Sequence, residues 1–198
     1  IRFNYDGEVD SIEKTGLANK EKMARICLIV PVSSKGFKNM PFKQTTMFLH
    51  LLKSLRSTIE DSYLYSLLIG IDHGDTYWDQ HKPDILNTFE GKSNIDVAFV
   101  PVVGGSFTKP VNAIAAHAHA RTKERECNYY TRVNDDSDFL STGWAKMAIE
   151  TLNHYEPKNL GVVGPTVPQG NTAILVFDFV HRMHMDIFQT YYPPELNN

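Results

Sequence analysis

Several features that define common protein classes are missing from this sequence of 198 residues. No apolar run reaches the roughly 18 residues that span a bilayer, and no signal-peptide pattern is present. The absence of an Asn-x-Ser/Thr sequon weighs slightly against secretion. A net charge of −3 gives the chain no overall attraction to nucleic acid or to acidic membranes. We therefore expect a soluble domain that spans no membrane and binds no nucleic acid.

The sequence contains only two cysteines, and they leave the redox compartment open. Cys27 lies in an apolar run and is expected in the core, whereas Cys127 follows a charged helix end. One such pair neither requires nor excludes an oxidising environment. Because the chain begins with Ile1 and ends at Asn198 without a clear stop, we expect a fragment. The sequence leaves the location open between the cytoplasm and, if an anchor is missing from the sequence, the Golgi lumen.

Familiar catalytic signatures are also missing. The chain has no Walker A loop, no Gly-x-Gly-x-x-Gly motif after its first predicted strand and no Gly-x-Ser-x-Gly elbow. An EF-hand loop beginning at Asp135 would need glycine at its sixth position, where Leu140 stands. An aspartyl-phosphate hydrolase would carry its Asp-x-Asp motif after the first strand. In this sequence the motif is Asp136-Ser137-Asp138, which follows the fourth predicted strand.

Short apolar runs alternate with helical patterns from residue 25 onward. Strands are predicted at 26–30, 67–71, 97–100, 129–133 and 160–164, and helices near 48–59, 77–89, 109–125 and 144–152. This alternation predicts an α/β fold with a mostly parallel central sheet and helices on both faces. The length suits one domain over 25–198, preceded by a polar arm over 1–24.

Polar segments follow four of the predicted strands. They are Ser33 with Ser34, residues 72–75, Gly104 with Gly105, and the acidic residues 134–138. Right-handed crossovers bring the C-terminal ends of parallel strands to one sheet edge, where ligands bind in open α/β folds. We therefore expect these segments to surround one site. For residues 72–75 alone, an ordinary Asp-Gly turn is the favoured alternative.

The predicted helix after Gly104 and Gly105 begins with features that suit an anion. Thr108 is expected to cap it and Pro110 to occupy its first turn. Free N–H groups at the helix start, together with the charge of Lys109, would attract phosphate. The alternative is a plain capped helix with an exposed lysine.

Three carboxylates within the segment 134–138 indicate a cation site. Asp135, Asp136 and Asp138 repel one another unless a charge neutralises them. Mg²⁺ or Mn²⁺, bound by one or two carboxylates and by phosphate oxygens, is the usual solution. Asp136 and Asp138, at positions i and i+2, project the same way from an extended chain. A solvated acidic turn remains the alternative.

The order of these features over residues 25–165 resembles the GT-A fold of nucleotide-sugar-dependent glycosyltransferases, family 2-like members in particular. The resemblance implies that the first strand end, an acid after the second strand, a basic residue and an Asn at the helix start, and the Asp-x-Asp motif hold the donor. The implied donor-binding residues are Pro31, Val32, Ser33, Asp72 (with Asp75 as second choice), Lys109, Asn112, Asp135 and Asp136. The implied metal ligands are Asp136 and Asp138.

The function implied by this resemblance is metal-dependent transfer of a sugar. The donor would be a UDP- or GDP-sugar, the cofactor Mn²⁺ or Mg²⁺, and the acceptor a hydroxyl of a glycan, lipid or protein. Inverting members use a catalytic carboxylate, for which Asp178, Asp186, Glu195 or a residue beyond Asn198 are the candidates. The alternatives are a sugar-1-phosphate nucleotidyltransferase, whose loop residues 33–37 match poorly, and a non-catalytic domain that binds metal or nucleotide sugar.

Overall fold

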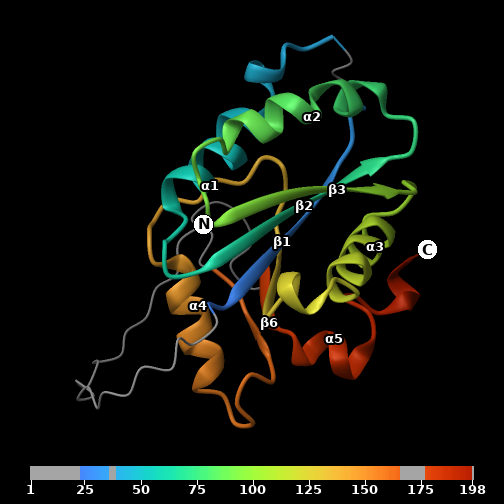
Figure 1. The fold of residues 1–198 in the computed structure, drawn as a ribbon. Coiled ribbons are helices and arrows are strands. Elements are labelled where there is room, and N and C mark those ends of the chain that lie inside the picture. Colours follow the sequence, from blue (N-terminus) through green and yellow to red (C-terminus); the bar gives the residue numbers. More distant parts are fainter. Residues whose placement is uncertain (1–22, 36–38, 166–176, 198) are drawn as a thin grey trace.

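A computed structural model describes residues 23–35, 39–165 and 177–197, and it has an α/β fold built on a mixed sheet (Figure 1). The arm predicted over 1–24 lies outside the described residues except for Met23 and Ala24. The strands are β1 (Arg25–Val32), β2 (Leu64–Asp72), β3 (Ile95–Val102), β4 (Tyr129–Arg132), β5 (Val162–Val163) and β6 (Asp178–His181). The longer helices are α2 (Thr76–Thr88), α3 (Thr108–His119) and α4 (Trp144–Asn153). The short ones are η1 (Phe42–Gln44), η2 (Met47–Leu52), α1 (Lys53–Thr58), η3 (Lys123–Arg125), α5 (Met183–Phe188) and η4 (Pro194–Asn197).

The described strands form one sheet in the order β3-β2-β1-β4-β6-β5. The pairs β1–β2, β2–β3 and β1–β4 are parallel, whereas β6 runs antiparallel to both β4 and β5. The chain therefore moves outward from β1 to β3 and returns to the other side of β1 for β4. This reversal is a topological switch point, and ligands bind beside it in open α/β sheets. The prediction of a mostly parallel sheet is confirmed.

Strand β1 shows why these residues form a central strand. Its side chains alternate, so that Ile26, Leu28 and Val30 enter the core on one face while Cys27 and Ile29 enter the core on the other. All of them have no exposed surface. A strand buried on both faces must be apolar at every position, and the continuous run in the sequence reflects this.

Helices cover both faces of the sheet, as predicted. The core on one face takes side chains from η2, α1, α2 and α4, and the core on the other takes them from α3 and α5. Figure 1 shows α3 and α5 together on one side, with α1 and α2 on the other. Gly70 of β2 permits the close approach of α3, because a Cβ there would lie 2.4 Å from Cδ1 of Ile114.

Two sequence predictions about elements were inaccurate, and one strand was missed. The helix predicted over 109–125 ends at His119, because the charged residues that follow offer no apolar side chain to bury and form the separate turn η3. The strand predicted at 160–164 shrinks to Val162–Val163 between glycines. Strand β6 was not predicted. Its pairing with β4 depends on a partner far away in the sequence.

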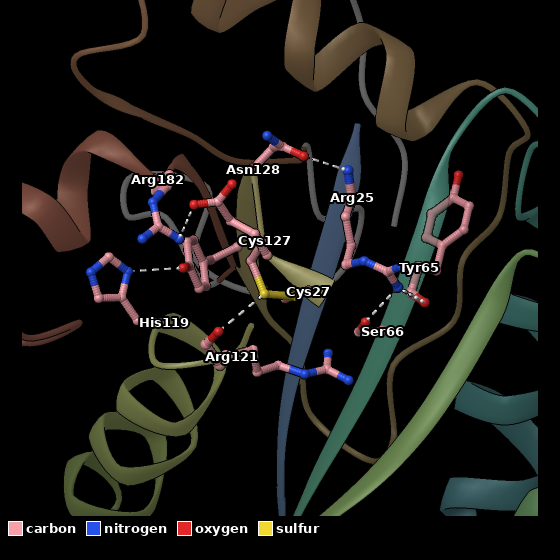
Figure 2. The surroundings of a disulfide bond; sticks show 12 residues. Arg25, Cys27, Tyr65, Ser66, His119, Arg121, Cys127, Asn128 and Arg182 are labelled. Carbon is pink, nitrogen blue, oxygen red and sulfur yellow. Dashed lines mark hydrogen bonds and ion pairs between the residues drawn. A yellow bond between two sulfur atoms is a disulfide. The ribbon is translucent and has the colours of Figure 1, made fainter. Parts of the chain in front are cut away.

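The two cysteines form a disulfide, which the sequence left open. Cys27 of β1 and Cys127, just before β4, have their Cα atoms 5.8 Å apart and no exposed surface. Figure 2 shows the neighbouring Arg25 N–H donating to Oδ1 of Asn128, at 2.8 Å. The disulfide therefore joins the central strands β1 and β4 at the edge where both begin.

Within the described part of the chain, each helix is too short or too polar to cross a lipid bilayer.

Candidate functional site

A cavity of about 500 Å³ opens where the parallel strands end. Its walls come from the end of β1, the end of β2, the loop before α3 and the segment after β4. The lining residues are Pro31, Val32, Ser33, Lys35, Asp72, Gly104, Gly105, Ser106, Phe107, Pro110, Asn134, Asp135 and Asp136. This is the edge at which the switch point between β1 and β4 places a ligand.

Most of the residues predicted to bind the donor line this cavity. The strand end Pro31, Val32 and Ser33 does so, together with Asp72 after β2 and the pair Asp135 and Asp136 after β4. Parallel pairing of β1 with both β2 and β4 brings these three segments together. The structure thus places them as the strand-end argument predicted, although what they bind stays a prediction.

Asp72 lies directly against the glycine-rich loop. A Cβ added to Gly104 would be 2.8 Å from both carboxylate oxygens of Asp72, so any larger residue there would displace this carboxylate. Asp75, the second choice for the same role, is engaged elsewhere. Its carboxylate accepts the N–H of Ser34 at 2.8 Å and the N–H of Trp78 at 3.2 Å, which caps α2.

The acidic segment forms a turn with an unfavourable concentration of charge. Ser137 N–H donates to the carbonyl of Asn134 at 3.3 Å, and Asp135 and Asp136 occupy the turn between them. Burial, and then the charge of Asp136, raises the pKa of Asp135. A cation bound here would offset both effects.

Asp138, the other predicted metal ligand, is not among the residues lining the cavity. Its Oδ2 lies 2.8 Å from Nδ1 of His50 in η2. The rule that places i and i+2 on one side holds for extended chain, whereas the turn at Asp135 and Asp136 interrupts the alternation. The described residues contain no cluster of three or more His, Cys, Asp or Glu side chains suited to a metal.

Helix α3 contributes its first turn to the cavity, but differently from the prediction. Thr108 does not cap it: its hydroxyl donates to the carbonyl of Leu196 at 2.6 Å. The hydroxyl of Ser106 instead accepts the N–H of Lys109 at 3.3 Å. Lys109 is exposed and is not one of the lining residues. Asn112 is bound to the backbone of Tyr192, through both its Oδ1 and its Nδ2.

None of the candidate catalytic bases lines the cavity. Asp178, at the start of β6, accepts the hydroxyls of both Tyr191 and Tyr192. Asp186 lies at the opposite edge of the sheet, 3.4 Å from Nε2 of His119. Glu195 is exposed in η4. The choice of base therefore stays open.

Seven lining residues were not among the predicted donor-binding residues: Lys35, Gly104, Gly105, Ser106, Phe107, Pro110 and Asn134. Three of these add a charge, an amide or an aromatic ring to the cavity. Lys35 is exposed beside the end of β1 and supplies a positive charge. Asn134 accepts a hydrogen bond from Nη1 of the buried Arg132 at 2.8 Å. Phe107 is exposed at the start of α3. The only signal in the sequence was their position next to predicted strand ends or helix starts.

Comparison with known proteins assigns no family. No protein-family model matches the chain, and no curated protein matches its sequence. The function must therefore be argued from the cavity.

Proposed function

We propose that this chain is a metal-dependent glycosyltransferase of GT-A type whose cavity binds a nucleotide-diphosphate sugar. The observation that carries the proposal is the convergence on one cavity of Asp72 after β2, the glycine-rich loop before α3, and the adjacent acids Asp135 and Asp136. Asp72 suits a ribose hydroxyl or a base N–H, the glycine-rich loop suits a phosphate, and the two acids suit a cation. The cavity volume of about 500 Å³ lies within the range of small-molecule sites.

The polar groups of the cavity suit the separate parts of such a ligand. Asp72 offers carboxylate oxygens to a ribose hydroxyl or a base N–H. The close approach permitted by Gly104 lets a ligand reach the backbone at the start of α3, and the dipole at a helix N-terminus favours phosphate. Lys35 adds a full positive charge to the same cavity.

A divalent cation fits the chemistry of the acidic turn. Two adjacent carboxylates, one of them half-buried with a raised pKa, leave a negative charge that a cation would neutralise. Asp135 and Asp136 would hold Mn²⁺ or Mg²⁺, and phosphate oxygens of the donor would complete its oxygen ligands. When bound, the cation neutralises the charge that develops on the diphosphate leaving group.

The disulfide bears on the compartment. A buried disulfide between Cys27 and Cys127 persists in oxidising compartments and is rare in the cytosol. Of the two locations expected from the sequence, the disulfide favours the Golgi lumen.

Calorimetric titration with UDP and GDP tests the proposal, in Mn²⁺ and in EDTA. Binding is expected with Mn²⁺ and should disappear with EDTA. Asp135→Ala and Asp136→Ala should abolish the metal-dependent binding, whereas Asp138→Ala should weaken it less, because Asp138 lies outside the cavity. Asp61→Ala, an exposed acid in the turn before β2, is the matched control. Metal-independent binding, or none, would contradict the proposal.

A donor-binding domain without transferase activity is the second candidate. It is favoured by one observation: neither Asp178, Asp186 nor Glu195 lines the cavity. Hydrolysis of a panel of UDP-sugars separates the two candidates, since only a transferase should release UDP. Release of pyrophosphate from UTP and a sugar 1-phosphate would instead indicate a nucleotidyltransferase.

A further inference from the structure

Phe107 places an exposed aromatic ring in the wall of the cavity. The residue is 51% exposed and stands immediately before α3. Exposing a large apolar side chain forgoes the stabilisation that its burial would give. A single exposed phenylalanine is ordinary on a protein surface, so the argument depends on what lies behind the ring.

The position does not require phenylalanine for the helix. Residues at the N-cap of a helix usually carry a side-chain oxygen that accepts a backbone N–H. Phe107 has none, and Ser106 accepts the N–H of Lys109 in its place. The aromatic ring is therefore not explained by the capping of α3.

The ring of Phe107 is in contact with two other side chains of the protein. Cζ of Arg132 lies 5.0 Å from its centroid, a cation–π contact, and the ring centroid of Tyr192 lies 6.4 Å away. Arg132 is only 7% exposed, so this contact is largely shielded from water. Shielding strengthens such an interaction. The orientation of Phe107 is thus determined by the buried Arg132 and the partly buried Tyr192.

Arg132 is itself held in place by hydrogen bonds. Its Nη1 donates to Oδ1 of Asn134 at 2.8 Å, and its Nε donates to the hydroxyl of Tyr192 at 3.2 Å. Tyr192 in turn donates its hydroxyl to Asp178, and its backbone is bound at both N–H and carbonyl by Asn112. Arg132 therefore contacts both Phe107 and Asn134, and it holds these two parts of the cavity wall in position relative to each other.

We propose that Phe107 is a platform on which a flat ring of the bound ligand stacks, with Arg132 as the positioning residue behind it. The inference rests on the proposed function, which supplies a ligand with three kinds of ring: the nucleobase, the ribose and the transferred sugar. A cation behind one face of the phenyl ring draws electron density from the other face. That other face then suits an electron-rich nucleobase better than the C–H face of a pyranose.

Titrations in Mn²⁺ with UDP, GDP, a UDP-hexose and inorganic pyrophosphate test the platform. Phe107→Leu keeps an apolar side chain but removes the ring, and it should weaken UDP and GDP roughly tenfold. Pyrophosphate has no ring, so its affinity should not change. Phe107→Trp keeps an aromatic ring, so it should bind UDP and GDP about as tightly as the wild-type protein does. Phe188→Leu is the matched control, because Phe188 is also an exposed phenylalanine, at 58%, and lies on α5.

The outcomes show whether the nucleobase or the sugar stacks on Phe107, and whether any ring stacks there. Loss confined to the UDP-hexose would assign the stacked ring to the sugar. Unchanged affinity for all three nucleotides in Phe107→Leu would overturn the inference, as would an equal loss for pyrophosphate. A wild-type protein that binds none of these ligands would overturn the proposed function, and with it the platform.

Fluorescence gives a second measurement. Trp78 and Trp144 are buried, at 0% and 1% exposed, so the indole introduced by Phe107→Trp would be the accessible one among the described tryptophans. UDP should protect this indole from iodide quenching, whereas pyrophosphate should not. Arg132→Gln, combined with Phe107→Trp, should reduce the protection by UDP while pyrophosphate affinity is retained. Quenching by iodide that UDP leaves unchanged would contradict the platform.

Discussion

Reduction of the disulfide between Cys27 and Cys127 is expected to lower the free energy of unfolding by several kcal/mol. The two residues are 100 positions apart in the sequence. The chain-entropy model gives about 4.7 kcal/mol for a closed loop of ~100 residues at 25 °C. Since domains are stable by about 5–15 kcal/mol in total, this is a large share. The sulfur atoms remain in the core after reduction, so the loss is mainly that of the crosslink.

Urea unfolding measures this loss through the fluorescence of the buried Trp78 and Trp144. With a denaturant slope of about 2 kcal/mol/M, reduction should lower the midpoint by about 2 M. A double variant, Cys27→Ala with Cys127→Ala, should unfold at a low midpoint that reductant does not change. A wild-type midpoint unaffected by reductant would refute the reasoning, as would free thiols in the unfolded, unreduced protein.

Further predictions concern the cavity wall, its support and the opposite edge of the sheet. Gly104→Ala should weaken UDP binding roughly tenfold in calorimetry without lowering the melting temperature, because the new Cβ would displace the Asp72 carboxylate while the exposed loop tolerates the change. Tyr192→Phe should lower the free energy of unfolding by about 2 kcal/mol, since it removes a hydrogen bond to the Asp178 carboxylate; an unchanged urea midpoint would contradict this. Burial lowers the pKa of His119, so the folded state binds fewer protons there than the unfolded state. Stability should therefore be full above about pH 6.5 and fall as the pH drops below it, and His119→Gln should reduce this dependence in thermal melts.

Much of the sheet was predictable because its central strands are buried on both faces. An apolar run such as Ile26 to Val30 has few other structures available to it, and polar segments mark its ends. Strand β6 lacked this signal, since it is short and carries Asp178 and His181 at its ends. Its strand conformation depends on pairing with β4 and β5, which are distant in the sequence.

The site was predictable where it depended on strand ends, and less so where side chains find distant partners. Parallel pairing alone brings Asp72 and Asp135 to one edge. No local pattern shows that Asp138 would bond to His50, or that Asn112 would bind the backbone of Tyr192. These contacts join segments far apart in the sequence, and the turn after β4 decides which of the acids faces the cavity.

The arrangement of stabilising contacts explains how this edge of the sheet tolerates an open, charged cavity. Asp135 and Asp136 repel each other there, and Phe107 leaves half of its surface in water. At the other end of the same strands, the disulfide joins Cys27 of β1 to Cys127, just before β4. There, Asp96 also forms ion pairs with Arg25 at 2.5 Å and with Arg121 at 2.6 Å. Because β1 and β4 are fixed where they begin, their ends can carry charged and exposed side chains that contribute little to the packing of the core.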